Sequence, residues 1–190
     1  MGLLDIITGR RKLAQPAEDR VFAMTRAYVT MQMSLGLTSR GKVAIVFQPL
    51  ATADFAAIVS DMEEVVSATA SDSKTTVSTS DDPYGFRWLV LSGEDFDQLV
   101  AGLHAVSSAL EAGGYGERVL CAVFTFADAQ QKRIYWIYNY KRGAFYPFVP
   151  AGGSEQRDSE REFVLKAQIG AELPVENDLT RWFPLWGIPV

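Results

Sequence analysis

Three consecutive segments in the second half of the chain restrict the fold more than any other part of the sequence. The first, Arg118 to Phe126, is apolar at both alternating sets of positions, which is typical of a strand inside a covered sheet. The second, Arg133 to Tyr140, is rich in aromatic residues on both alternating faces, with Ile134, Trp136, Tyr138 and Tyr140 on one and Tyr135 and Ile137 on the other. The third begins at Phe145. Short turns link them, the second at Lys141-Arg142-Gly143, so we expect an antiparallel meander. Its aromatic rings would then fill a core, with their hydroxyl groups bonded at the rim.

The rest of the chain alternates between helical and strand patterns. Apolar residues at helical spacing, with capping residues and glycine stops, predict four helices, over 16–35, 52–66, 92–112 and 154–171. We expect the third of these to begin at Ser92, and we expect Met24, Met31 and Met33 of the first to be core residues. Short alternating or β-branched runs predict strands over 43–47, 75–79 and 86–91. The predicted fold is α+β: an antiparallel sheet of about five or six strands with four helices packed on it, in a single domain.

The sequence divides into an N-terminal segment (1–15), the α+β domain (16–173) and a C-terminal strap (174–190). The strap carries Trp182, Phe183 and Trp186 among prolines, so it is neither a helix nor a central strand. We expect it to lie across its own domain as an apolar cover. The alternative is that it binds a partner, because exposed apolar clusters of this size usually mark contacts.

The N-terminal segment is amphipathic. Leu3, Leu4, Ile6 and Ile7 would share one side of a short helix, and Arg10, Arg11 and Lys12 follow them. One interpretation is a weak interfacial anchor, with the apolar side in the headgroups and the cations on anionic lipid. The other is a terminal segment that docks on its own domain or has no fixed structure. The basic cluster follows the apolar residues, which is the wrong order for a secretory signal. We therefore expect a cytoplasmic protein, with peripheral contact at the inner face of the membrane as the alternative.

Charge and composition exclude several functions. The net charge is -5, whereas nucleic-acid binding relies on clustered Lys and Arg. The chain has one cysteine, Cys121, and one histidine, His104, so it cannot form a multi-histidine or Cys-x-x-Cys metal site. Cys121 lies in a predicted buried strand, where a thiol is inert, and His104 borders the apolar face of its helix as a structural residue. We expect no cofactor and no nucleic-acid partner.

No catalytic motif occurs in the sequence. The adjacent carboxylates Asp81 and Asp82 lie in a predicted turn, which does not hold two acids in contrasting environments as general acid–base catalysis requires. The hypothesis of an enzyme therefore rests on an unrecognised hydrolase or transferase site, built from these two residues with Tyr84 and Arg87. A deep pocket that gathers these groups would support it.

Four segments of the sequence resemble the PspAB family, small proteins associated with phage shock protein A (PspA): RKLAQPAEDRVFAMTRAYVT, GYGERVLCAVF, IYNYKRGAFYPFVP and AELPVENDLTRWFPLWGIP. The resemblance runs from the initial MGLLDI to the terminal WGIP. It implies a cytoplasmic accessory protein of the envelope-stress system that binds PspA or a related membrane-stress component. The resemblance assigns no catalytic residue. Together with the missing catalytic motifs, it predicts a non-enzymatic adaptor that acts through protein–protein interaction.

Overall fold

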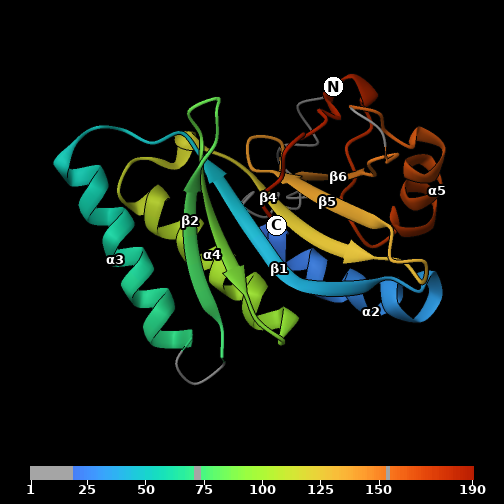
Figure 1. Cartoon of the computed structure of the whole chain (residues 1–190), viewed down its shortest axis with the longest axis horizontal. Helices are drawn as coiled ribbons and strands as arrows, with labels where there is room; N and C mark the ends of the chain where they lie inside the picture. The colour runs from blue at the N-terminus through green and yellow to red at the C-terminus, as the bar shows by residue number, and fades with distance from the viewer. Residues whose placement is uncertain (1–18, 71–73, 153–154) are drawn as a thin grey trace, which may run out of the picture.

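Six strands form one antiparallel sheet in the order β2-β3-β1-β4-β5-β6 (Figure 1). The computed structural model describes residues 19–70, 74–152 and 155–190. The strands are β1 (Thr38–Phe47), β2 (Thr76–Asp81), β3 (Arg87–Ser92), β4 (Val119–Ala127), β5 (Arg133–Asn139) and β6 (Ala144–Phe148). The described residues also contain four α-helices: α2 (Ala23–Leu35), α3 (Ala53–Ala70), α4 (Phe96–Ala112) and α5 (Ser159–Ile169). The predicted α+β fold, and the meander of β4, β5 and β6 within it, are confirmed.

The strand order defines the topology of the core. The crossover from β1 through α3 to β2 skips one position in the sheet, and β3 fills that position. The crossover from β3 through α4 to β4 likewise skips the position that β1 occupies. Two such interlocked split β-α-β units form the ferredoxin-like arrangement. The core therefore consists of β1, α3, β2, β3, α4 and β4, and the meander extends it by two strands.

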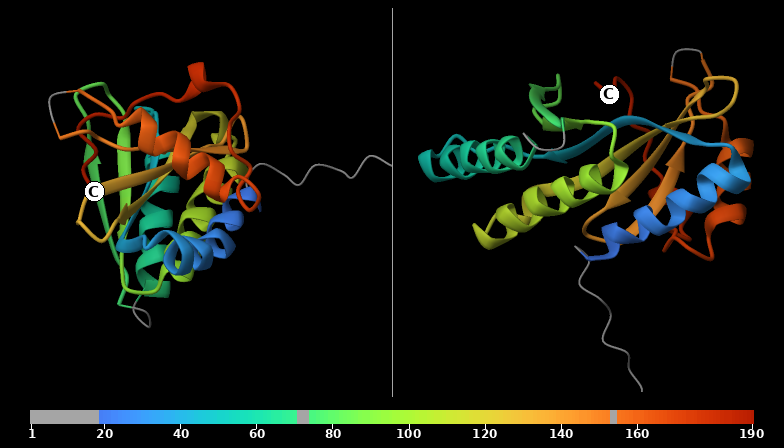
Figure 2. Two further views of the ribbon diagram at one scale, coloured as in Figure 1. Left: turned by 90° about the vertical axis from the view of Figure 1, so that its right-hand side faces the viewer. Right: turned by 90° about the horizontal axis from the view of Figure 1, so that it is seen from below.

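Both faces of the sheet are covered except at the edge strand β2, which is mostly exposed. Side chains that alternate along each strand point to opposite faces, so on β1 Val43, Ile45 and Phe47 face the helices while Ala44 and Val46 face the other side. The helices α2 and α4 lie against one face, and the end of the chain lies on the other (Figures 1 and 2). This double coverage explains why the central strand β4 is apolar at both sets of positions.

The aromatic residues of the meander are core residues, as expected. Trp136, Tyr138 and Phe145 are fully buried on the helix side, and Phe148 is fully buried on the other side. The Tyr138 and Phe145 rings lie 4.5 Å apart between centroids. The tight turn between β5 and β6 contains Gly143 at φ +60°, a conformation that glycine adopts without strain.

Two predicted helix starts were wrong. Ser92 is the last residue of β3, and α4 begins after Asp95, whose side chain accepts a hydrogen bond from the Gln98 N–H. The helix expected from residue 154 begins only at Ser159, because Asp158 caps it by accepting from the Arg161 N–H. In both cases an aspartate that satisfies a free N–H determines the boundary. At the N-terminus, a 3-10 turn, η1 (Asp19–Phe22), precedes α2 within the described residues.

Two further expectations need correction. β1 begins at Thr38, five residues before the predicted start. Its pairing with β4 is irregular between Ser39 and Val43, where Gly41 has φ +66°, so the first half of the strand lacks a regular period of two. Met33 is 84% exposed, so only Met24 and Met31 of that predicted set are core residues. Gly36, the predicted helix stop, adopts the left-handed conformation that ends α2.

Candidate partner-binding surface

The strap, residues 174–190, covers the face of the sheet opposite the helices. Its first residues extend the sheet edge, because the Phe145 N–H donates to the Pro174 carbonyl and the Glu176 N–H donates to the Phe145 carbonyl, both at 2.8 Å. After the 3-10 turn η3 (Leu179–Arg181), the Trp182 ring stacks on the Tyr146 ring at 6.3 Å. The strap therefore protects the outer edge of β6, and Trp182 and Trp186 pack into the apolar cluster on the face of the sheet opposite the helices.

A charged cluster fixes the strap to β6 and α5. The Arg157 guanidinium donates to the Glu162 carboxylate at 2.9 Å and to the Trp182 carbonyl at 2.7 Å. The Glu162 carboxylate also accepts from the Val149 N–H at 2.9 Å. Burial raises the pKa of the Glu162 carboxyl, and the hydrogen bonds from Arg157 and Val149 act in the opposite direction. Three separate parts of the chain thus meet at one ion pair.

A second cluster fixes the beginning of the strap. Glu176 is 8% exposed and accepts from the Asp178 N–H at 3.0 Å and from Arg142 Nε at 3.0 Å. These bonds lower the pKa of the Glu176 carboxyl, and the bond from the Asp178 N–H has the largest effect. Asp178 in turn accepts from the Thr180 hydroxyl and from Arg181, and these bonds lower its pKa to about 2. Arg142, in the turn after β5, is therefore a contact of the strap.

The predicted strap residues have different roles. Trp182 is 5% exposed, and its indole N–H donates to the Glu176 carbonyl at 3.1 Å. Trp186 is half-buried with its ring 5.0 Å from the Phe148 ring, whereas Phe183 is 58% exposed. Trp182 and Trp186 therefore pack against their own domain, and Phe183 is the member of the set that faces solvent.

A groove of mixed polarity lies between α5 and the start of the strap. It has a volume of about 520 Å³ and is lined by Phe163, Lys166, Ala167, Gly170, Leu173, Pro174, Val175 and Asn177. Phe163 is 48% exposed, and its ring lies 6.0 Å from the Trp182 ring. The Lys166 ammonium lies 5.6 Å from that indole ring. Phe183 follows Trp182 in the sequence, and the Trp182 ring contacts both Phe163 and Lys166 of the groove lining. We call the groove together with Phe183 the α5–strap surface; exposed phenylalanines of this kind are typical of a contact region.

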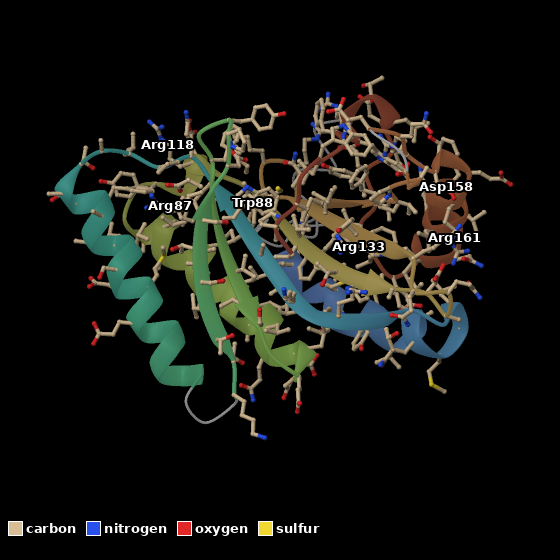
Figure 3. All side chains as sticks on the ribbon, viewed as in Figure 1. Arg87, Trp88, Arg118, Arg133, Asp158 and Arg161 are labelled. Atoms are coloured by element: carbon tan, nitrogen blue, oxygen red, sulfur yellow. The ribbon has the colours of Figure 1, made fainter. Side chains whose placement is uncertain are left out.

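Sequence reasoning missed Phe163 as a surface residue. It was expected as an ordinary member of a helix, but α5 packs on the core only through Leu165 and Ile169, with Glu162 buried beside them. Phe163 and Val164 are 48% and 40% exposed, so this apolar pair lies on the solvent side of α5. Figure 3 shows Asp158 and Arg161 on the α5 side of the molecule.

The residues of the alternative enzyme site stabilise a turn. Asp81 forms a two-bond ion pair with Arg87, at 2.7 and 2.9 Å, and that contact lowers the pKa of the Asp81 carboxyl. Asp82 accepts from the N–H groups of Tyr84 and Phe86 and from the Trp88 indole. Tyr84 is 76% exposed. These groups lie at the β2–β3 hairpin, far from α5, as the labels Arg87 and Asp158 show (Figure 3).

The single cysteine and histidine are both packed. Cys121 is buried on β4, and burial raises its pKa to about 12. His104 lies on α4 with its ring 4.7 Å from the Phe22 ring, and its Nε2 lies 3.5 Å from the Ser108 hydroxyl. Within residues 19–70, 74–152 and 155–190, no three His, Cys, Asp or Glu side chains gather as a metal ion would need.

The predicted N-terminal contact residues, Leu3, Leu4, Ile6, Ile7, Arg10, Arg11 and Lys12, lie outside the described residues. None of the described helices has the length and apolar content that crossing a bilayer requires.

The fold and the surface define a class: a single-domain α+β protein with a ferredoxin-like core, two added strands and an exposed apolar surface formed by α5 and the strap. The chain belongs to the PspAB family, because the family model for PspA associated protein B matches residues 1–190. The resemblance found in the sequence is therefore confirmed. No curated protein and no solved structure matches the chain.

Proposed function

We propose that this protein is a non-enzymatic accessory protein of the envelope-stress system, which acts in the cytoplasm by binding PspA through the α5–strap surface. The family assignment supports association with PspA. The observation that carries the location is the exposure of Phe163 on the groove and of Phe183 in the strap, while Trp182, which contacts Phe163 and precedes Phe183, is buried. The buried tryptophan fixes the backbone that presents Phe183, so little conformational entropy is lost when a partner binds.

The contacts of the conspicuous polar groups favour binding over catalysis. Asp81 is paired with Arg87 and Asp82 accepts from groups of its own turn, and the thiol of Cys121 is buried with a raised pKa. Glu162 and Arg157 bond to each other and to backbone groups. A hydrolase or transferase would need at least one such group free at a cavity to take a proton or attack a substrate. The alternative enzyme function has less support for this reason.

The test is a binding measurement between purified full-length protein and purified PspA at physiological salt. Phe183→Ser and Phe163→Ser should each weaken binding about tenfold or more, because a central aromatic contact contributes roughly 1.4 kcal/mol or more. Met33→Ser and Tyr84→Ser are matched controls, since they remove large exposed side chains from α2 and the β2–β3 hairpin. The controls should bind like the unmodified protein.

Two results would reject parts of the proposal. Absence of binding by the unmodified protein would reject PspA as the direct partner. Binding that is weakened by the Met33 or Tyr84 substitution, and not by those at Phe163 and Phe183, would reject the location.

A further inference from the structure

A second groove, this one apolar, lies between α3 and α4, outside the α5–strap surface. Its volume is about 330 Å³, at the lower end of the ~300–1,000 Å³ of ligand pockets. Its lining is Ile58, Asp61 and Met62 of α3 with Ala105, Val106, Ala109, Ala112 and Gly113 of α4 and its end. Asp61 is the one charged member of this lining. The groove is open to solvent, because Asp61, Ala105 and Ala112 are exposed.

The hollow results from the size of the α4 side chains. Ala105, Ala109 and Ala112 recur on one side of the helix, where larger residues would have filled the space against Ile58. At the far end the two helices meet closely, since a Cβ built on Gly113 would lie 2.5 Å from the Ile58 Cδ1 atom. The groove is thus a short apolar trough that ends at Gly113.

The two helices that form the groove carry negative charge only. Their sequences contain six carboxylates and no lysine or arginine: Asp54, Asp61, Glu63 and Glu64 on α3, and Asp97 and Glu111 on α4. Asp54, Asp61 and Glu64 are exposed. An occupant should therefore combine aliphatic side chains with cations, because its charges would then complement the helices around the groove.

We propose that the groove binds residues 1–12 of the same chain. This segment contains four aliphatic residues, Leu3, Leu4, Ile6 and Ile7, followed by the cations Arg10, Arg11 and Lys12. It is thus an aliphatic and cationic sequence of the kind that the groove and its acidic surroundings select. The segment itself lies outside the described residues, and the assignment depends on the groove, the charges and the connecting chain.

The connecting chain is long enough. Residues 13–18 can span about 20 Å when extended. The described chain begins in η1, which lies against α4, with the Phe22 ring 4.7 Å from the His104 ring. Ala105 to Ala112 follow His104 on the same helix, within about 12 Å along its axis at 1.5 Å per residue. The groove therefore lies within reach of the segment from the same chain.

Docking in the groove would make the segment unavailable to other surfaces. The aliphatic residues that would insert into a lipid interface are the ones that would fill the groove, and the cations would face carboxylates in place of anionic lipid. A membrane or a partner would then compete with α3 and α4 for residues 1–12.

The test uses methionine methyl NMR on the full-length chain. Met62 lines the groove, whereas Met33 is exposed on α2 and serves as an internal reference. The combined substitution Leu4→Ser and Ile7→Ser should shift the Met62 methyl signal and leave the Met33 signal unchanged. Leu13→Ser, which removes an aliphatic side chain from the connecting chain and none from residues 1–12, is the control and should leave both signals in place.

A synthetic peptide of residues 1–15 is then added to the Leu4→Ser, Ile7→Ser chain. It should return the Met62 signal saturably towards its original position, and a peptide with Arg10→Glu, Arg11→Glu and Lys12→Glu should fail to do so. A Met62 methyl signal that stays at the same chemical shift after both the substitutions and the addition of the peptide would overturn the proposal. A Met62 shift that depends on protein concentration would overturn the same-chain assignment, since a second copy would then supply the segment.

Discussion

Arg157 holds the carbonyl of Trp182 at 2.7 Å, across 25 residues of chain. The same guanidinium forms an ion pair with Glu162, which is 2% exposed and accepts from the Val149 N–H. A single arginine thus connects the end of β6, the first turn of α5 and the strap. This connection fixes the backbone at Trp182, whose ring contacts Phe163 of α5 and which directly precedes Phe183.

Removal of this arginine should loosen the strap. Arg157→Met leaves the Glu162 carboxylate buried without its cation, so the free energy of unfolding should fall by about 3 kcal/mol. Urea unfolding followed by tryptophan fluorescence measures the loss. Fluorescence quenching by iodide should also increase, because Trp182 loses the contact that fixes its backbone.

The double variant Arg157→Met, Glu162→Gln is the control for this prediction. Glutamine is neutral and keeps an oxygen that accepts from the Val149 N–H, so the double variant should be more stable than Arg157→Met alone. Equal stability of the two variants would show that the unpaired carboxylate is not the cause of the loss.

The sequence allowed prediction of elements whose signal is local. The meander follows from the apolar runs of β4 and β5 and the short turns between the strands, and the turn between β2 and β3 follows from Asp81 and Asp82, because these patterns lie within a few residues. The strand order could not be predicted, because it depends on which strands pair across α3 and α4. The irregularity at Gly41 hid the first half of β1, since it interrupts the period of two.

The candidate surface was only partly predictable, because it also depends on contacts between distant parts of the chain. The apolar strap was visible in the sequence, but its division into buried Trp182 and exposed Phe183 depends on the stack with Tyr146 and the bond to Arg157. Arg157 and Glu162 looked like ordinary surface charges of a helix start. The α3–α4 groove could not be predicted from the sequence, because alanine on a helix is common at both buried and exposed positions.

Trp182 and Phe183 are neighbours in the sequence but should contribute very differently to stability. Trp182→Ala removes a 5% exposed indole with its ring contacts and its hydrogen bond, so it should lower the free energy of unfolding by about 3–5 kcal/mol. Phe183→Ala removes a mostly exposed ring and should change stability by about 0.5 kcal/mol or less. Chemical denaturation of both variants tests this, and a large loss for Phe183→Ala would show that its ring is a core residue.

Asp178 should give the protein a specific acid sensitivity. Its hydrogen bonds lower its pKa from 3.8 to about 2 in the folded protein, so its stabilising contribution is complete above 3.8 and is lost as the pH falls towards 2. Asp178→Asn retains the side-chain shape without the titration. The difference in unfolding free energy between the unmodified protein and this variant should be largest above about pH 4 and should shrink towards pH 2. A difference that is constant with pH would contradict the assignment.

Cys121 should be unreactive in the folded protein. The thiol is buried on β4 with its pKa raised to about 12, so very little thiolate is present at neutral pH. A disulfide reagent that releases a coloured thiol should react with Cys121 only after denaturant unfolds the chain. Rapid stoichiometric labelling under native conditions would show that the strand opens or that the thiol is accessible, and would revive a catalytic role for it.

Gly41 and Gly36 should respond differently to the same substitution, although both have positive φ, +66° and +63°. A Cβ on Gly36 meets nothing within 4 Å, so Gly36→Ala should cost only the left-handed penalty, about 1 kcal/mol. A Cβ on Gly41 would lie 2.7 Å from the Gly93 carbonyl oxygen. This atom cannot easily move away, because the Gly93 N–H donates a hydrogen bond to the Gly41 carbonyl. Gly41→Ala should therefore cost about 2–4 kcal/mol, because a clash adds to the same penalty. Thermal and urea unfolding of the two variants would decide the matter, and equal losses would mean that the β1 irregularity has room for a side chain.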